Sequence, residues 1–227
     1  MPARAGGVRD RADGPGKAGG ETDSAEPFIP PRPTLAKLRS ASKKCRGCRL
    51  WKFGTQTVFG EGPADASIVL VGEQPGDQED LAGHPFVGPS GKLLDAALEA
   101  AGVDRDRAYV TNAVKHFKWE ERPGTTRRIH KKPSNAEVIA CHPWLEAELE
   151  LLEPKVVVCL GATAAQSLLG KDFRVSTQRG KVMKPWGATP VVIATVHPSS
   201  VLRAPAPERA QAEKEFFRDL KKVARFV

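Results

Sequence analysis

Short apolar runs alternate with amphipathic stretches over most of the chain after residue 66. Four of these runs have the length of a strand, and they are "SIVLVG" (67–72), "AYVTNAVK" (108–115), "KVVVCLG" (155–161) and "TPVVIATVHPSS" (189–200). Uninterrupted apolar strands are typical of a parallel sheet that is buried on both faces.

Helical periodicity follows each of the four runs. The amphipathic stretches cover residues 89–103, 134–152, 162–170 and 207–227. In the second stretch, Ser134 is a predicted N-cap and Glu137 stands in the capping-box position. Strands that alternate with helices in this way predict an α/β fold, in which a central four-stranded parallel sheet is flanked by helices.

The N-terminal part of the chain has a different composition. Residues 1–30 contain almost no large apolar residues and are rich in Gly, Ala, Asp and Arg, so we expect a disordered tail. Residues 34–48, "TLAKLRSASKKCRGC", predict a short helix that leads into a pair of cysteines. The predicted organisation is therefore a tail over residues 1–30 and one folded domain over residues 31–227.

Polar segments follow three of the predicted strands. "GEQPG" comes directly after the first strand, "TNAVKH" ends the second and "HPSS" follows the fourth. In open α/β sheets, ligands bind in the crevice beyond the carboxyl ends of the strands. We therefore expect these three segments to meet in one site at this edge of the sheet.

The charge of the chain is positive and unevenly distributed. The formal net charge is +8 over 227 residues, and residues 1–30 hold four Lys or Arg against five Asp or Glu, which leaves +9 for the predicted domain. Such an excess favours a polyanionic partner, most often nucleic acid, although a merely soluble basic protein has the same composition. No apolar run is long enough to span a membrane and no secretory signal is found, so we expect a cytoplasmic protein. A monomer is the default expectation for its oligomeric state.

Four cysteines need an explanation in a cytoplasmic protein, where disulfides are disfavoured. Cys45 and Cys48 form a C-x2-C pair, Cys141 lies in the long predicted helix and Cys159 lies in the third predicted strand. The spacing suits either a zinc ion or an iron–sulfur cluster, because C-x2-C supplies two ligands from one turn. The structural alternative is that Cys141 and Cys159 are ordinary buried thiols.

Residues 125–134, "TTRRIHKKPS", place a histidine among four cations. From Lys115 to Lys132 there are seven Lys or Arg and only two Glu, which suits a DNA backbone and predicts salt-sensitive binding. A mostly neutral imidazole is a poor phosphate ligand and a good nucleophile, so His130 is a candidate for chemistry. The structural alternative is a solvated basic loop that contains an incidental histidine.

Five features occur in one order along the chain. They are "GEQPGDQEDLAGHPFVGPSGKLLD" (72–95), "TNAVKHF" (111–117), "RRIHKKPS" (127–134), "VHPSS" (196–200) and the four cysteines. Together they resemble the iron–sulfur uracil-DNA glycosylases over roughly residues 40–225, and they are most similar to the UdgX-type branch, which becomes covalently joined to uracil-containing DNA. Family-4 enzymes usually read G-E-A-P-G at the first motif and lack the basic histidine loop, whereas this sequence has Gln74 and His130.

The resemblance implies a uracil pocket. Phe86 would stack on the uracil ring, and Asn112 would accept a hydrogen bond from uracil N3–H and donate one to O4. His197 would donate to uracil O2 as negative charge builds on the departing base. Their structural alternatives are a core phenylalanine, a turn-capping asparagine and a satisfied histidine. The residues that would hold phosphates, or fill the space left by the flipped base, are Ser199, Ser200 and Arg203.

The resemblance also implies a covalent step. His130 would attack C1′ of the deoxyribose after uracil leaves, with Glu73 positioning the imidazole or taking its proton and Gln74 in the same site. For Glu73 the structural alternative is a carboxylate at a helix N-terminus. The DNA backbone would be held by Arg127, Arg128, Lys131 and Lys132.

The four cysteines, under the same resemblance, would bind a [4Fe–4S] cluster that attaches the N-terminal segment to the domain. Cys45, Cys48, Cys141 and Cys159 are all expected as its ligands. The other histidines are interpreted as structural or surface residues, and they are His84, His116 and His142.

Three functions remain open at this stage. The first is a crosslinking uracil-DNA glycosylase that prefers single-stranded DNA, where base flipping costs less. The second is a conventional turnover glycosylase, in which water attacks C1′ and His130 contacts a phosphate. The third is a metal-stabilised nucleic-acid-binding or redox-sensing module without catalysis, which the convergent Glu, Asn and His disfavour.

Overall fold

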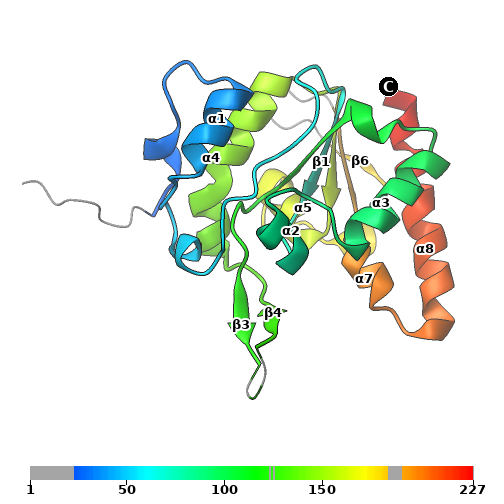
Figure 1. Ribbon diagram of the computed structural model, residues 1–227. Coiled ribbons are helices and arrows are strands. Elements are labelled where there is room, and N and C mark those ends of the chain that lie inside the picture. The colour runs from blue at the N-terminus through cyan, green and yellow to red at the C-terminus, as the bar shows by residue number, and fades with distance from the viewer. Residues whose placement is uncertain (1–22, 123, 125, 184–190, 227) are drawn as a thin grey trace, which may run out of the picture.

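A five-stranded sheet lies at the centre of the computed structural model, which describes residues 23–122, 124, 126–183 and 191–226 (Figure 1). In the order β2-β1-β5-β7-β6, the strands are β2 (Ala108–Asn112), β1 (Ile68–Gly72), β5 (Val156–Leu160), β7 (Val192–Thr195) and β6 (Val182–Met183). The first four are parallel, as predicted, whereas β6 pairs antiparallel with β7. The prediction of four strands was wrong by one, because a strand of two residues is too short to form an apolar run.

Both faces of the sheet are covered by helices, because alternate residues of each strand point to opposite sides. In β1, Ile68 and Leu70 pack on one face, whereas Val69 and Val71 pack on the other. The helices on the first face are α3 (Pro89–Ala100), α7 (Pro198–Leu202) and α8 (Ala206–Lys221). Those on the second face are α4 (Asn135–Leu152) and α5 (Ala162–Leu169).

The helices expected from the sequence are present with small shifts at their ends. The capping box of α4 is confirmed, since the Ser134 side chain accepts from the Glu137 N–H and the Glu137 side chain accepts from the Ser134 N–H. The remaining helical elements are α1 (Leu35–Ser42), α2 (Asp77–Ala82), α6 (Val175–Gln178), η1 (Glu26–Phe28), η2 (Arg49–Lys52), η3 (Arg105–Arg107) and η4 (Val223–Phe226). Among the described residues, no helix combines the length and the apolar character needed to cross a membrane.

A two-stranded antiparallel hairpin projects away from the sheet (Figure 1). It is formed by β3 (Trp119–Glu121) and β4 (Arg128–His130), and Trp119 pairs with His130. The sequence did not predict the hairpin, because its strands are three residues long and mostly polar. The pairing places His130 at the base of the hairpin, close to the sheet, and not at its tip.

The folded domain begins before residue 31. Residues 23–30 belong to the predicted tail, yet η1 forms within them and Ala25 is buried. The Ala25 N–H donates to the Ala140 carbonyl of α4 at 2.7 Å. Residues 1–22 of the predicted tail lie outside the described residues.

Candidate active site

A cavity of about 490 Å³ lies at the carboxyl ends of β1, β2, β5 and β7. The predicted site residues that line it are Glu73, Gln74, Phe86, Asn112, Arg127, His130, His197, Ser199 and Arg203. The expectation that polar segments from distant parts of the sequence meet at this edge is therefore confirmed. The predicted residues outside its lining are Arg128, Lys131, Lys132 and Ser200.

The floor of the cavity is formed where β1 and β2 end side by side. Gly72 pairs with Asn112, and a Cβ at Gly72 would lie 2.3 Å from Asn112 Oδ1 and 2.7 Å from Phe86 Cζ. A side chain at residue 72 would therefore displace both groups from the cavity. Asn112 is 2% exposed, and within the described part of the chain its Oδ1 atom has no hydrogen-bond partner. Since buried acceptors are nearly always satisfied, this atom points to a ligand.

A buried ion pair supports the end of β2. Lys115 Nζ donates to Glu148 Oε2 at 2.5 Å, to Thr111 Oγ1 at 2.7 Å and to the Asn112 carbonyl at 2.8 Å. The Lys115 and Glu148 side chains are 1% and 0% exposed, and the Tyr109 hydroxyl donates to Glu148 at 2.9 Å. Lys115 therefore fixes the backbone from which the Asn112 amide extends.

Lys115→Met is expected to destabilise the fold by about 3–5 kcal/mol, because it leaves the Glu148 carboxylate buried without its partner. Arg105→Met is the control, since Arg105 pairs with Asp95 at 3.1 Å on the surface, where the two side chains are 31% and 50% exposed. Its expected cost is below about 1 kcal/mol. Urea unfolding of both variants measures the difference. Equal losses would contradict the supporting role of the buried pair.

Phe86 reaches the cavity from a turn with an uncommon backbone conformation. Its φ is 57°, in the left-handed region that residues other than glycine seldom adopt. A Cβ on Gly91 would lie 1.6 Å from the Phe86 carbonyl oxygen, so the start of α3 packs directly on this turn. The Phe86 ring lies 6.0 Å from the His197 ring at an interplanar angle of 29°. The turn therefore delivers an aromatic ring to the cavity wall beside an imidazole.

His197 is the N-cap of α7, and its hydrogen bonds assign its tautomer. The Ser199 N–H donates to Nδ1 at 3.2 Å, and the Ser200 hydroxyl donates to the His197 carbonyl at 2.7 Å. Since Nδ1 accepts, the proton of the neutral ring is on Nε2. Burial, with smaller contributions from His130 and Arg203, lowers the pKa of His197 to about 4. At neutral pH His197 is therefore an uncharged hydrogen-bond donor.

Glu73 follows β1 directly and lies between α5 and the hairpin. The Thr163 hydroxyl donates to Glu73 Oε2, and the other oxygen, Oε1, lies 3.5 Å from His130 Nε2. The Glu73 and His130 side chains are 21% and 47% exposed. The carboxylate therefore acts on the imidazole mainly through its charge, at a distance longer than a strong hydrogen bond.

Gln74 connects the end of β1 to the hairpin. Its Oε1 accepts from the Lys118 N–H at 3.2 Å, which turns its Nε2 toward the Lys131 carbonyl at 3.0 Å. The same Nε2 lies 3.0 Å from His130 Nε2, which therefore accepts the hydrogen bond. His130 is thus assigned the tautomer with its proton on Nδ1 and its lone pair on Nε2.

The electrostatics of the site favour a neutral His130. Burial lowers its pKa from the ordinary value of 6.5, and Arg203 adds to this decrease, whereas the charge of Glu73 opposes it. The Phe117 ring lies 6.0 Å from the imidazole at an interplanar angle of 46°. A neutral imidazole with a lone pair on the cavity wall is a competent nucleophile.

Arg128 is engaged within the protein, which corrects its prediction as a DNA contact. Its Nη1 lies 2.6 Å from Asp80 Oδ2, and its Nε lies 2.6 Å from Asp77 Oδ1. The side chain is 16% exposed, and its guanidinium lies 5.5 Å from the centroid of the Trp119 ring. Because Arg128 stands two residues before His130, these contacts position the hairpin that carries the imidazole.

The other predicted DNA contacts surround the cavity. Arg127 and Arg203 line it, and Lys131 pairs with Glu120 at 2.7 Å with both side chains about half exposed. Lys132 lines a neighbouring cavity between α4 and α5. Arg127 and Arg203 therefore lie at the active-site cavity itself, whereas Lys131 and Lys132 lie outside its lining.

Three of the four cysteines gather where the N-terminal segment meets α4. Cys45, Cys48 and Cys141 pack in one cluster with Trp144, whose indole nitrogen lies 3.2 Å from Cys45 Sγ. Cys159 lies in β5 and packs in a different cluster, in the core under α4 and α5. The prediction of a four-cysteine ligand set was therefore wrong at Cys159, because the sheet holds that thiol in its interior.

Desolvation of the thiols disfavours their ionised form. Burial raises the pKa of Cys48 to about 11 and that of Cys141 to about 12, and the neighbouring cysteines contribute to both. Burial alone raises the pKa of Cys159 to about 12. Among the described residues, no three His, Cys, Asp or Glu side chains are arranged to hold a single metal ion. Three close thiols suit a larger group, since its ligands lie farther apart than those of one ion.

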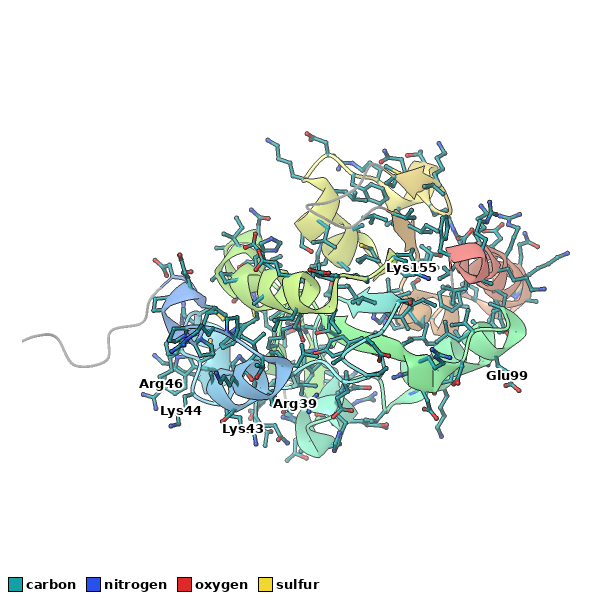
Figure 2. The ribbon with its side chains drawn as sticks, turned by 90° about the horizontal axis from the view of Figure 1, so that it is seen from above. Arg39, Lys43, Lys44, Arg46, Glu99 and Lys155 are labelled. Carbon is teal, nitrogen blue, oxygen red and sulfur yellow. The ribbon has the colours of Figure 1, made fainter. Side chains whose placement is uncertain are left out.

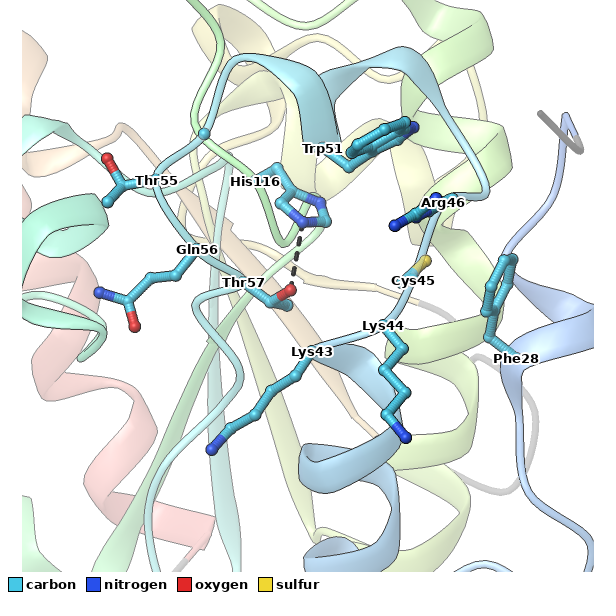
Figure 3. Close-up of a pocket in the computed structure, with 11 residues that line it drawn as sticks. Phe28, Lys43, Lys44, Cys45, Arg46, Trp51, Thr55, Gln56, Thr57 and His116 are labelled. Atoms are coloured by element: carbon cyan, nitrogen blue, oxygen red, sulfur yellow. Dashed lines mark hydrogen bonds between the residues drawn. The ribbon is translucent and has the colours of Figure 1, made fainter. Parts of the chain in front are cut away.

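His116, which the sequence placed among structural or surface residues, lies beside the cysteine cluster. His116 and Cys45 line one cavity of about 500 Å³ (Figure 3). His116 Nε2 lies 3.1 Å from the Thr57 hydroxyl, and burial lowers the pKa of His116 to about 4. A neutral imidazole at this place is a candidate for the fourth donor. The sequence missed it because no spacing rule links it to the cysteine pair.

Comparisons with known proteins agree with this geometry. The chain matches the uracil DNA glycosylase superfamily over residues 59–221. A type-4 uracil-DNA glycosylase of Archaeoglobus fulgidus is 41% identical over 185 residues, which cover 79% of this chain and 86% of that protein. A type-4 enzyme of Sulfurisphaera tokodaii is 37% identical over 76% of this chain and 77% of its own. A type-5 uracil-DNA glycosylase of Pyrobaculum aerophilum is 29% identical over 74% and 76%.

Proposed function

The chain belongs to the uracil DNA glycosylase superfamily, and we propose that it excises uracil from DNA and then joins His130 covalently to the sugar. The observation that carries the first part is the buried Asn112 Oδ1 atom, which lines the cavity without a partner among the described residues. The second part is supported by a neutral His130 that Gln74 holds on the same cavity.

Uracil recognition follows from the amide of Asn112. Uracil presents a donor at N3 and an acceptor at O4, which match the Oδ1 acceptor and the Nδ2 donor of an asparagine. Cytosine presents the reverse pattern at the same positions, so it would leave the buried Oδ1 unsatisfied. Phe86 supplies an apolar face for the ring, and the base must be flipped out of the stack to reach it.

Departure of the base is assisted by His197. The bond between uracil N1 and C1′ breaks with its electron pair, which leaves on uracil and accumulates partly on O2. A neutral His197 with its proton on Nε2 donates a hydrogen bond to that oxygen. Because the ring is half-buried and largely shielded from water, this interaction is stronger than it would be in water.

Departure of uracil leaves cationic character on C1′. One residue stabilises this charge and a second attacks C1′. The Glu73 carboxylate places a negative charge beside the cation. The lone pair on His130 Nε2 forms a bond to C1′, and the Nδ1 proton of the resulting imidazolium passes to water. Gln74 holds the imidazole at the cavity before the reaction through its hydrogen bond to Nε2, and this hydrogen bond breaks as the lone pair forms the bond to C1′.

A conventional turnover glycosylase is the second candidate, because the type-4 relatives carry that name and the cavity also admits water. Water would then attack C1′, and His130 would contact a phosphate. Abasic product in excess over the enzyme would select this alternative.

The cysteine cluster fits a [4Fe–4S] group held by Cys45, Cys48 and Cys141, with His116 as the fourth donor. When bound, the group would serve as a crosslink between the N-terminal segment and α4 rather than as a reactant. The DNA would be single-stranded by preference, and its phosphates would be held by Arg127, Lys131, Lys132, Ser199, Ser200 and Arg203.

Adduct formation is expected to be independent of pH from about 8 to about 6.5 and to fall at lower pH. The pKa of His130 lies below its ordinary value, so the ring loses its nucleophilic lone pair only as the pH falls through that lower pKa. His197, with a pKa of about 4, does not set this fall. Single-turnover rate constants over the pH range measure it. A fall that begins above neutrality would contradict a neutral His130.

Release of free uracil from a single-stranded oligonucleotide with one uracil tests the proposed function, with a thymine oligonucleotide as control. With DNA in excess, a crosslinking enzyme releases one uracil per protein molecule and then stops. Many turnovers would select the conventional glycosylase. Absence of release by protein with its cofactor intact would contradict both glycosylase functions.

A further inference from the structure

A second region of strong positive charge surrounds the cysteine pair, outside the active site. Residues 39–52 contain six cations, and they are Arg39, Lys43, Lys44, Arg46, Arg49 and Lys52. No Asp or Glu occurs from residue 27 to residue 60. Residues 39–52, here called the basic cysteine segment, therefore lack the carboxylates that partly neutralise the loop around His130. The proposed reaction does not use this segment.

The cations of this segment lie together on the surface. Figure 2 shows Arg39, Lys43, Lys44 and Arg46 along one edge of the molecule, with Glu99 at the opposite end. Lys43, Lys44 and Arg46 are exposed, and they line the cavity of about 500 Å³ that contains His116 (Figure 3). A concave surface with several cations and no carboxylate of its own segment has the charge that binds phosphates.

An aromatic ring is interleaved with these cations. Trp51 lines the same cavity, and the Arg46 guanidinium lies 4.6 Å from the centroid of its ring. The Trp51 indole nitrogen is buried and, in the part of the chain that the structure describes, has no acceptor. Cations that follow a backbone, combined with an aromatic face for a base, are typical of surfaces that bind single-stranded nucleic acid.

Residues at and beside the cavity contact the base of the hairpin that carries His130. Thr55 lines the cavity, and its hydroxyl accepts from Arg128 Nη1 at 3.2 Å. The Phe53 carbonyl, directly after residues 39–52, accepts from the Trp119 indole N–H at 2.7 Å. In Figure 1 the chain around residue 50 accordingly lies beside the base of β3. A strand that leaves the active site across the hairpin base therefore meets the basic cysteine segment next.

We propose that the exposed cations of the basic cysteine segment bind phosphates of the DNA strand that flanks the excised uracil, with Trp51 beside them as a base contact. The donors Cys45 and His116, which line the same cavity, remain with the iron–sulfur group. The proposal rests on the proposed function, since it takes DNA as the substrate. It assigns the N-terminal segment a binding role in addition to its contacts with α4, and it predicts that affinity increases with the length of the flanking strand.

The test compares K43Q/K44Q with the wild-type full chain, both with the cofactor bound. Neither lysine lines the active-site cavity. Binding of a long uracil-free single strand is measured by fluorescence anisotropy as a function of salt. Uracil release is measured with an oligonucleotide too short to extend beyond the active site. We expect about tenfold weaker binding of the long strand and a salt slope smaller by about 1.4, because each single-strand phosphate contact contributes about 0.7.

The matched control is K214Q/K221Q, which removes two exposed cations of α8 on the other side of the domain (Figure 1). It should keep the wild-type slope, and the visible absorbance of the iron–sulfur group should be equal in all three proteins. If the salt dependence of DNA binding by K43Q/K44Q had the wild-type slope, the proposal would be overturned. An acidic protein would then be the favoured partner of the segment. Equal losses in both variants would also overturn it. Failure of the proposed function would appear separately, as absence of uracil release from the short oligonucleotide by the wild type.

Discussion

His130→Ala is expected to reduce the denaturation-resistant DNA adduct to below about 10⁻³ of the wild-type rate, as expected when a nucleophile is removed. Alanine offers no lone pair to C1′, whereas Asn112, His197 and Glu73 still bind uracil and stabilise its departure. Water reaches C1′ in the space that the imidazole leaves, so uracil release is expected to continue as turnover. The two products are measured together, the adduct on a denaturing gel and free uracil by chromatography.

The control for this variant is His84→Ala. His84 is also a histidine on the protein surface, but it pairs with Glu61 at 2.5 Å and does not line the active-site cavity. It should form the adduct at the wild-type rate. An adduct that persists in His130→Ala would exclude His130 as the nucleophile. It would favour the alternative in which His130 contacts a phosphate.

Asn112→Ala is expected to slow uracil release by about 10²–10³-fold, or roughly 3–4 kcal/mol of transition-state stabilisation. The variant removes both groups that read uracil, and it leaves Phe86 and His197 in place. Because Oδ1 has no hydrogen-bond partner among the described residues, the free protein loses no bond of that atom. The free energy of unfolding should therefore stay the same or rise, whereas the rate of uracil release falls.

Two measurements separate recognition from damage to the fold in this variant. Single-turnover release of uracil gives the activity, and urea unfolding gives the stability. Asn135→Ala, at an exposed position in the first turn of α4, should change neither. If Asn112→Ala released uracil at the wild-type rate, the amide would be a structural cap and not the reader of the base.

The sheet and its main helices were predictable because each buried strand leaves a continuous apolar run and each helix a period of 3.6 residues. The strands of the hairpin leave no such signal. They are short and polar, and Gln74 and Arg128 hold them through contacts with residues far away in the sequence. The position of His130 beside Glu73 was therefore accessible only through the resemblance.

The basic loop shows a further limit of sequence patterns. Arg127 and Arg128 are adjacent and chemically identical, so both were predicted to bind the DNA backbone. In the structure Arg127 lines the cavity, whereas Arg128 turns to Asp77 and Asp80. The difference depends on these acidic partners, which are distant in the sequence and leave no signal in the basic loop itself.

The prediction of a four-cysteine ligand set failed for a related reason. Spacing identifies two ligands in one turn, but it does not report the side of a strand to which a later thiol points. Cys159 is enclosed by β1 and β7, on which Val71 and Ala194 are its partners, and it cannot reach the N-terminal segment. Cys141 lies on α4, which packs on α1, and it reaches the cluster with Cys45.

The central claim is that uracil removal and attachment of His130 occur in one site. It is tested most directly by mixing the protein with labelled single-stranded DNA that carries one uracil, and by separating the products on a denaturing gel beside a thymine control. We expect a shifted band that survives heat and detergent, with uracil only. Alkali-sensitive abasic DNA without any shifted band would contradict the covalent step, and unchanged DNA would contradict excision itself.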